Sequence, residues 1–291
     1  MNHWTELPCM LNGEPCLLGE AKVSAMDRGF LFGDGVYEMV PVYQRRLFRV
    51  DAHLARLQHS LAAVKMASPM ERDGWLALMR GLVQRLPDTD QWVYLQVTRG
   101  VAMRDHVMPQ GLAPTVFAFA MPQRPVPAEL RHQGASCITA RDFRWERGDI
   151  KSTSLLGNVL ARQMSADHEA QETILLRDGF LTEASSSNVW MVKDGALIGP
   201  PRSEHVLEGV RIELMRELCE ELGLGFNRRP ISESELITAD EIMLSSATKE
   251  VLAVTRLDHE PVGHGALRGK PGPVYARLYE AYQRAKPLQS L

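Results

Sequence analysis

Residues 148–158 read GDIKSTSLLGN and place a lysine between a predicted strand and a predicted helix. A lysine at such a boundary is most often a solvated cation. It can also be a Schiff-base lysine, whose amine binds an aldehyde cofactor and later carries a proton. Lys151 is therefore a candidate catalytic residue. Other segments of the chain help to decide between a solvated cation and a Schiff-base lysine.

Downstream of Lys151, residues 181–190 read LTEASSSNVW, and Glu183 lies between two predicted strands. A glutamate here commonly occupies a turn or caps a helix. It can also face the pyridine nitrogen of a cofactor, where a carboxylate keeps that nitrogen protonated so that the ring accepts electrons from a substrate carbanion. Glu183 is therefore a second candidate.

Two further segments offer groups that bind anions. In VLEGVRIEL a helix is predicted to begin at Gly209, so the backbone N–H groups of Val210 and Arg211 would form an anion site favoured by the helix dipole. At the end of a predicted strand, LSSATKEV offers the hydroxyls of Ser245, Ser246 and Thr248. Each signal is weak alone, because helices that begin at a glycine and strand ends rich in hydroxyl groups are both common.

The first half of the chain holds three candidate cations. Arg56 lies off the apolar stripe of a predicted helix, where the default is a solvated side chain and the alternative is a phosphate-binding arginine. Arg104 and His106 lie two residues apart in a predicted loop, residues 99–111. In an extended backbone both would point to one side and could converge on a substrate carboxylate.

Composition excludes several classes of protein. The 291 residues are 45% hydrophobic and 24% charged, and the net charge of −3 argues against nucleic acid as the main partner. No apolar run approaches the roughly 18 residues that span a bilayer, and the first residues lack the pattern of a secretion signal. Four cysteines without metal-ligand spacing predict reduced thiols in the cytoplasm, and we expect no metal site.

The order of elements predicts an α+β fold with two domains. Pro122, Pro125 and Pro127 indicate a linker at residues 122–127, between an N-terminal domain at 1–121 and a C-terminal domain at 128–291 that carries Lys151. Asp51 is expected to cap a helix, and Asn12-Gly13, Asp178-Gly179 and Asp194-Gly195 to turn hairpins. Other predicted strands are 36–43, 47–50, 92–98, 115–120, 136–141 and 241–246, the last before a polar loop; other predicted helices are 73–86, 154–171, 209–222 and 273–285.

The local wording of these segments resembles that of the class IV aminotransferases, the family of D-amino acid aminotransferase, branched-chain aminotransferase and aminodeoxychorismate lyase. The resemblance covers nearly the whole chain, from Asn12 to Val254. The stretches that carry it are DRGFLFGDGVYEMVPVY, HLARL, VYLQVTRG, DIKSTSLLGNVLA, LTEASSSNVW and LEGVR. It implies fold type IV, with a smaller N-terminal α/β domain and a larger barrel-like C-terminal domain, pyridoxal 5'-phosphate as cofactor, and a homodimer with a loop shared between subunits.

The resemblance also implies a role for each candidate. Lys151 would be the Schiff-base lysine and Glu183 the partner of the pyridine nitrogen. The phosphate would be held by Arg56, the backbone amides of Val210 and Arg211, and Ser246, while Leu207 would lie against the cofactor ring. D-amino acid aminotransferases carry Arg-x-His after QVTRG, here Arg104-Asp105-His106, and with Tyr37 these residues would trap the substrate α-carboxylate.

Two positions depart from the family pattern. Arg211 and Ala247 stand where threonines that bind the phosphate are common, so Ser246, Thr248 or Arg211 would have to compensate. The expected reaction is transamination between a D-amino acid, such as D-alanine, and a 2-oxo acid, such as 2-oxoglutarate. The alternatives are a branched-chain L-aminotransferase, an aminodeoxychorismate lyase, a transaminase for amines, or a non-catalytic binder of the cofactor.

Overall fold

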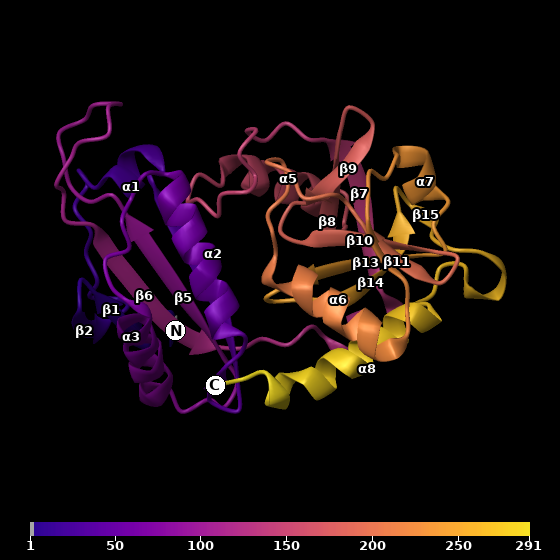
Figure 1. Ribbon diagram of the computed structural model, residues 1–291, viewed down its shortest axis with the longest axis horizontal. Helices are drawn as coiled ribbons and strands as arrows, with labels where there is room; N and C mark the ends of the chain where they lie inside the picture. Colours follow the sequence, from indigo (N-terminus) through magenta and orange to yellow (C-terminus); the bar gives the residue numbers. More distant parts are fainter. Residues whose placement is uncertain (1–2) are drawn as a thin grey trace. The chain divides into compact units, whose positions relative to one another are not determined.

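The computed structural model describes residues 3–291, which form two compact units. The first unit contains the described residues up to Arg124 together with Ile150–Leu155 and Lys286–Leu291. The second contains Pro125–Asp149 and Leu156–Ala285. Figure 1 traces both along the chain by colour.

The segment that carries Lys151 belongs to the first unit, although the sequence assigned it to the C-terminal domain. The reason lies in the backbone: the Tyr37 N–H donates to the Lys151 carbonyl at 3.0 Å, and Val36 forms an isolated bridge with Ser152. The last residues of the chain join the same unit, because Leu47 and Leu291 exchange two backbone hydrogen bonds of 2.9 Å. The domain boundaries therefore differ from those expected at 1–121 and 128–291.

The first unit is built on a six-stranded sheet with the order β2-β1-β6-β5-β3-β4. Along β5 buried and half-buried residues alternate, and Val93, Leu95 and Val97 join the core that α2 and α3 complete. This alternation is the period expected when one face of a sheet packs on helices. Its elements are η1 (His3–Glu6), β1 (Pro8–Leu11), β2 (Glu14–Leu17), α1 (Arg28–Phe32), β3 (Gly35–Tyr43), β4 (Arg46–Leu47), α2 (Val50–Ala63), α3 (Arg72–Arg85), β5 (Gln91–Thr98) and β6 (Thr115–Pro122).

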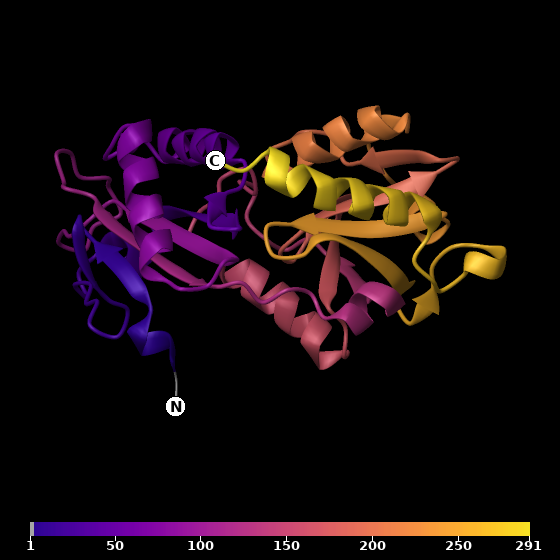
Figure 2. The same ribbon diagram turned by 90° about the horizontal axis from the view of Figure 1, so that it is seen from below.

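The second unit is built on a curled nine-stranded sheet of mixed direction, seen from a second side in Figure 2. Its strand order is β12-β11-β10-β13-β14-β7-β8-β9, and β15 pairs with β14. Its elements are α4 (Ala128–Gln133), β7 (Ala135–Arg141), α5 (Leu156–Asp167), β8 (Glu172–Arg177), β9 (Phe180–Ala184), β10 (Asn188–Lys193), β11 (Ala196–Gly199), α6 (Val210–Leu222), β12 (Phe226–Arg228), α7 (Glu233–Ile237), β13 (Glu241–Ser246), β14 (Glu250–Leu257), β15 (Glu260–Pro261), η2 (Gly265–Leu267) and α8 (Pro273–Leu288).

Three local predictions are wrong. Asp51 does not cap α2, because the N-cap is Arg49 and the Asp51 side chain accepts a hydrogen bond from Arg72. The φ of 50° at Arg49 also ends the strand that was predicted to reach residue 50. The polar loop expected after β13 is a tight turn into the buried strand β14. The helix predicted from residue 154 begins at Leu156, because Ser154 Oγ donates to the Gly33 carbonyl, and it ends at Asp167, before Glu169 adopts a φ of 54°.

Candidate active site

Lys151 lies in an extended segment held against β3. Its backbone N–H donates to Ser60 Oγ at 3.1 Å, while its carbonyl accepts from Tyr37. Both ends of the residue are thereby fixed and only the side chain is left to move. The ammonium Nζ lies 4.1 Å from the centre of the Tyr37 ring, a cation–π contact. Two of the predicted site residues, Lys151 and Tyr37, are thus neighbours.

A buried ion cluster follows Tyr37 on β3. The Glu38 carboxylate is fully buried and accepts two hydrogen bonds of 2.8 Å from the fork of Arg56, and Nδ1 of His53 lies 2.7 Å from its Oε2. Burial opposes ionisation of Glu38, but the charges and hydrogen bonds of Arg56 and His53 outweigh it and hold the pKa well below its usual range. Arg56 therefore has a fixed orientation, set by a carboxylate.

Glu38 and His53 were not among the residues predicted from the sequence. A signal was present, because His53 and Arg56 lie three residues apart on α2 and so share a face of that helix. Glu38 was also the one charged residue within an apolar predicted strand. An acid inside a buried strand requires a cationic partner, and the nearby helix supplies one.

Arg104 and His106, in the loop between β5 and β6, both contact the ring of Phe32 at the end of α1. The Arg104 guanidinium carbon is 5.3 Å from the ring centre and the His106 ring is 5.5 Å away. Arg28 contacts the same ring at 4.7 Å and donates to the Asp105 carbonyl at 2.5 Å. Arg28 therefore ties the loop to α1 at the residue between the two predicted substrate-binding side chains.

The three predicted carboxylate-binding residues form two groups. Tyr37 stacks on Tyr94 with ring centres 5.7 Å apart, whereas Arg104 and His106 gather at Phe32. Within residues 3–291, neither Arg104 nor His106 makes a hydrogen bond, ion pair or ring contact with Tyr37. One chain alone does not assemble the predicted carboxylate trap through such contacts.

The first unit also contains a cavity of about 340 Å³. The buried carboxylate of Asp27 lies in its wall. It accepts hydrogen bonds from Thr115 Oγ1 at 2.6 Å and from the Gly29 amide at 2.8 Å. None of the predicted site residues lines this cavity. Its lining residues are Val23, Asp27, Gly29, Phe30, Gln96, Thr98, Thr115, Phe117 and Thr153.

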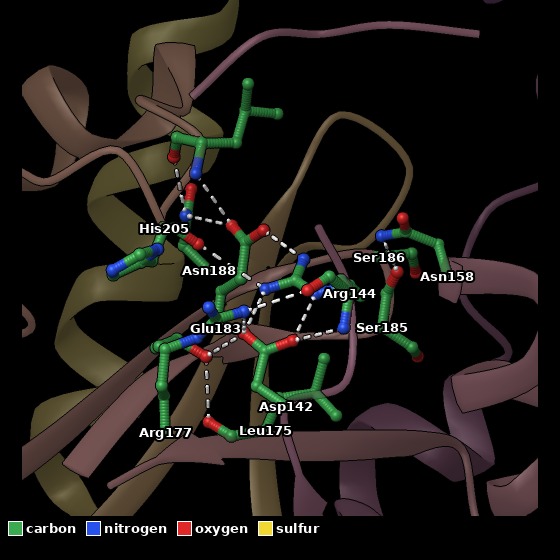
Figure 3. A network of polar contacts seen from close by, with 12 residues as sticks. Asp142, Arg144, Asn158, Leu175, Arg177, Glu183, Ser185, Ser186, Asn188 and His205 are labelled. Atoms are coloured by element: carbon green, nitrogen blue, oxygen red, sulfur yellow. Dashed lines mark hydrogen bonds and ion pairs between the residues drawn. The ribbon is translucent and has the colours of Figure 1, made fainter. Parts of the chain in front are cut away.

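In the second unit, Glu183 at the end of β9 is the centre of a buried polar network, drawn in Figure 3. Its Oε1 accepts from Arg144 at 2.5 Å, and its Oε2 accepts from the Leu207 amide at 3.1 Å and from Asn188 at 3.4 Å. Arg144 is held in turn by both oxygens of Asp142, at 3.0 and 2.9 Å. The sequence singled out Glu183 and Leu207, but Asp142, Arg144 and Asn188 were not predicted.

Opposing effects act on the Glu183 carboxyl. Burial raises its pKa above the usual range, because a charge is costly away from water. Arg144 and the Leu207 amide oppose that rise, since both stabilise the carboxylate. The pKa of Arg144 is itself raised by Asp142 and Glu183 despite its burial. The network is thus a chain of alternating charges, in which each buried carboxylate has a cationic neighbour.

The N-cap of helix α6, beside this network, is Gly209. It has no side chain to accept a hydrogen bond from the first-turn amides of Val210 and Arg211. A Cβ atom on Gly209 would overlap Asn188 Oδ1. Asn188 also donates to the Leu207 carbonyl at 3.0 Å, so it links the start of β10 to the segment that leads into α6. The predicted anion site at this helix start retains its backbone donors.

The structure limits which side chains could replace the missing threonine hydroxyls. The side chain of Arg211 is buried and donates to the Tyr282 hydroxyl of α8 at 3.3 Å. Ser245 is also a core group, because its hydroxyl accepts from Trp190 Nε1 at 2.9 Å. Ser246, by contrast, is half-buried, and its Oγ accepts only the Lys249 amide at 3.1 Å and lies 3.4 Å from Thr248 Oγ1.

A second carboxylate, Glu172 on β8, anchors the three serines that follow Glu183. It is fully buried and accepts hydrogen bonds from the hydroxyls of Ser185, Ser186 and Ser187 and from Lys249 Nζ, the last at 2.5 Å. Lys249 lowers the pKa of Glu172 against the effect of burial. The turn between β9 and β10 and the turn after β13 are therefore tied to one carboxylate.

Comparison with known proteins identifies the family. Residues 35–257 match the family model described as amino-transferase class IV. The chain belongs to the class IV aminotransferases. It is 38% identical to a D-alanine aminotransferase of Bacillus licheniformis over 95% of this chain and 96% of that protein. It is 36% identical to the D-alanine aminotransferase of Staphylococcus aureus strain COL over 94% of this chain and 96% of that protein. This aminotransferase is thus an enzyme, as predicted.

Solved structures confirm the predicted fold type IV. The branched-chain amino acid aminotransferase of Escherichia coli matches with a TM-score of 0.89 and 24% identity over 97% of this chain and 95% of that chain. The branched-chain aminotransferase of the archaeon Thermoproteus uzoniensis, solved with norvaline, matches with a TM-score of 0.86 and 22% identity over 96% and 94%. In the described part of the chain, no helix is long and apolar enough to cross a membrane, and no cluster of three potential metal-binding side chains occurs.

Proposed function

We propose that this aminotransferase moves the amino group of a D-amino acid, such as D-alanine, to a 2-oxo acid, such as 2-oxoglutarate. The observation that carries the proposal is the likeness to proteins named D-alanine aminotransferase along nearly the full length of both chains. The motif Arg104-Asp105-His106 supports it, because the side that holds the α-carboxylate decides which enantiomer reacts. The named branched-chain enzymes are less similar in sequence and share the fold.

The donor set fits pyridoxal 5'-phosphate, which the family implies. When bound, the cofactor supplies an electron sink for the carbanion formed at the substrate Cα. Glu183 would hold a proton on the pyridine nitrogen. Arg144 and the Leu207 amide support that role, because both favour its charged form. Lys151 would bind the aldehyde and would take the α-proton at Nζ and return it, as its fixed backbone and mobile side chain permit.

The phosphate would be held mainly by backbone donors and one arginine. We assign it to Arg56, the amides of Val210 and Arg211, and the hydroxyl of Ser246, with Ala247 offering only its backbone. The bidentate pair with Glu38 supports the role of Arg56, because it fixes the guanidinium plane. The hydrogen bond from the Arg211 side chain to Tyr282 favours Ser246 or Thr248 as the group that compensates for the missing threonines. Leu207 would lie against the cofactor ring.

The carboxylate trap of Tyr37, Arg104 and His106 would be assembled in a homodimer, with the loop supplied by the partner subunit. Two observations support this arrangement. Within residues 3–291, Tyr37 makes no hydrogen bond, ion pair or ring contact with Arg104 or His106. The same loop exposes Met103 by 83% and Val107 by 72%, apolar surface that a partner would cover.

Mixing two impaired variants, assayed at a D-alanine concentration far below KM so that Arg104→Ala is nearly inactive as well as Lys151→Ala, tests the shared loop. Lys151→Ala and Arg104→Ala proteins are unfolded together and refolded, so that about half of the dimers are mixed and one site in each mixed dimer is intact. A shared loop predicts recovery of about a quarter of the wild-type activity. A loop that acts within its own chain predicts no recovery above the sum of the two variants.

The reaction itself is tested by the absorbance of the purified holoenzyme after adding D-alanine or L-leucine separately, with the released 2-oxo acid measured enzymatically. Bleaching of the cofactor band and pyruvate release with D-alanine alone support the proposal. Bleaching with L-leucine alone would replace it with branched-chain transamination. A coloured protein that responds to neither substrate would indicate a lyase, an amine substrate, or a binder without turnover.

The four cysteines are all free thiols in the structure. This supports the predicted location in the cytoplasm, where thiols are kept reduced. Fractionation of cells that express the protein tests the location.

A further inference from the structure

Cys9 and Cys16 face each other across the hairpin formed by β1 and β2. The two residues are direct partners in the antiparallel register, and their Sγ atoms lie 3.0 Å apart. Side chains of directly opposed residues point to the same face of a sheet. The backbone therefore brings the two sulfur atoms together, and neither side chain has to reach for the other.

We propose that Cys9 and Cys16 form a reversible cross-strand disulfide by exchange with a small disulfide of the oxidised-glutathione class. The inference rests on the hairpin alone and stands whether or not the proposed function holds. Cys137 and Cys219 are also free thiols, but both are buried, and they serve as internal controls.

The backbone geometry meets one requirement of the bond, the separation of the Cα atoms. The Leu18 N–H donates to the Leu7 carbonyl at 2.9 Å, so pairs 7–18, 9–16 and 11–14 are the hydrogen-bonded ones, with Cα atoms about 5.5 Å apart. That separation lies in the usual range for disulfides. The Cβ atoms of such a pair are about 5.5 Å apart, against about 3.8 Å in a disulfide, so the edge strand would have to shift as the sulfur atoms close by about 1 Å. Pro15, which lacks an N–H, lies at a pair that needs none.

The exposure of the two thiols sets the order of the exchange. Cys16 is half-buried on the edge strand β2, so a soluble disulfide can reach it, whereas Cys9 is fully buried. The Cys16 thiolate would attack one sulfur of the small disulfide, forming a mixed disulfide and releasing one small thiol. The Cys9 thiolate would then attack the sulfur of Cys16 and release the second. Two protein thiols are thereby oxidised and one small disulfide is reduced to two thiols.

Burial and the contact with Cys16 raise the pKa of Cys9 to about 12. Because the thiolate is the nucleophile, closure by Cys9 is expected to be the slow step and to accelerate about tenfold per pH unit between pH 7 and pH 9. In a compartment rich in reduced thiols the pair would stay open, and it would close when the ratio of small disulfide to thiol rises.

The cysteine pair lies at one end of a row of cross-strand partners. The register runs from Cys16 to Cys9, Phe119, Tyr94 and then Met39. Tyr94 stacks on Tyr37, whose ring the Lys151 ammonium contacts. A disulfide would therefore fix the edge of the same sheet face that carries Tyr37.

The test uses the intact holoenzyme, freed of reductant and incubated with oxidised glutathione. Remaining thiols are blocked, and the protein is analysed by intact mass and peptide mapping. We expect a product that carries two blocking groups where the fully reduced protein carries four, with residues 9 and 16 in one disulfide-linked peptide pair and with Cys137 and Cys219 blocked as thiols. The dithiol form should return after treatment with reduced glutathione.

Two matched variants separate the steps. Cys9→Ser should stop at a stable mixed disulfide on Cys16 and gain one glutathionyl group. Cys16→Ser should remain unmodified, because Cys9 is buried. The proposal is overturned if the wild-type protein keeps its full reduced mass, or if it accumulates the same stable mixed disulfide as Cys9→Ser at pH 9.

Discussion

The Glu183 network and the Arg104–His106 loop contain similar groups, but they hold them in opposite ways. The charges of Asp142, Arg144 and Glu183 are buried, and each meets another charge, a backbone amide or a side-chain amide at 2.5–3.4 Å. Arg104 and His106 are exposed and rest on the face of one aromatic ring at 5.3 and 5.5 Å. The first arrangement keeps one geometry, whereas the second can adjust to what it contacts.

The difference matches the tasks proposed for the two regions. A group that must keep a proton on a ring nitrogen works best when its surroundings are fixed in advance. A loop that holds the α-carboxylate while the rest of the substrate varies gains from weaker contacts. If this comparison is right, changes near Glu183 will affect chemistry and stability, and changes in the loop will affect substrate affinity.

The largest effect is expected from Lys151→Ala, which sets the scale for both regions. Loss of the amine removes the proton carrier, so kcat should fall by at least about 10⁴-fold. Single-turnover absorbance and product release measure it, with Lys193→Ala as the control variant. Transamination that persists in Lys151→Ala would remove this residue from the mechanism.

Arg144→Met tests whether the network is held together by charge. Removing the cation leaves the Glu183 carboxylate buried without a charged partner and leaves Asp142 only its ion pair with Arg177 at 3.6 Å. Breaking such a buried pair costs about 3–5 kcal/mol in the free energy of unfolding. Denaturant unfolding measures the loss. The control is Arg216→Met on the exposed face of α6, for which a much smaller change is expected.

The double variant Arg144→Met with Glu183→Gln sharpens this test. Neutralising Glu183 removes the buried charge that Arg144→Met leaves without a cationic partner, so part of the lost stability should return. Equal destabilisation by the single and double variants would mean that packing, and not charge pairing, determines the contribution of Arg144.

Glu183→Gln is expected to separate chemistry from cofactor binding. Glutamine keeps the shape but loses the charge that holds a proton on the pyridine nitrogen, so kcat should fall by about a hundredfold. Cofactor affinity, measured by fluorescence titration of the apoenzyme, should change by less than about threefold because the phosphate contacts remain. An unchanged kcat would rule out the proposed role.

Arg104→Ala should act mainly on substrate affinity. Loss of one charged contact to the α-carboxylate is expected to raise KM for D-alanine by about tenfold to a hundredfold, with little change in the free energy of unfolding. Steady-state kinetics with D- and L-alanine measure the effect and its enantiomer preference. A large loss of stability without a change in KM would contradict the contrast between the two regions.

The smallest effect is expected from Phe32→Leu. Its cation–π contact with Arg104 is worth about 0.5–1 kcal/mol, so KM should rise only about twofold to fivefold while kcat is kept. Phe32→Tyr should restore the wild-type KM, because it keeps the ring. Phe180→Leu, at an exposed site on β9, is the control for loss of an aromatic side chain.

The parts of the site that the sequence predicts best are those with a local signature. Lys151 and Glu183 stand in distinctive short stretches, and fold type IV follows from those stretches together. Their partners lie far away in the chain: Arg144 is 39 residues from Glu183, and Glu38 is 18 residues from Arg56. Local patterns can mark one member of such a contact, as they do for Glu38 in its apolar strand, but they do not identify its partner, so the charge networks became visible only in the folded chain.

The errors in secondary structure have a similar cause. Glu250 adopts a φ of 60° at the turn between β13 and β14, a conformation usually taken by glycine or asparagine. Its turn signal was therefore hidden, and the polar residues around it resembled a loop. Arg49, with a φ of 50°, hid the start of α2 in the same way.

The close approach of Gly209 to Asn188 has a consequence for any library of mutants made from this enzyme. Any other residue at position 209 has to displace the Asn188 amide, which also contacts Leu207 and Glu183. In a deep mutational scan, position 209 should therefore tolerate no single replacement, yet accept alanine once residue 188 has been shortened. Substitutions at positions 188 and 209 are therefore coupled, and a search that changes one codon at a time would miss the functional combinations.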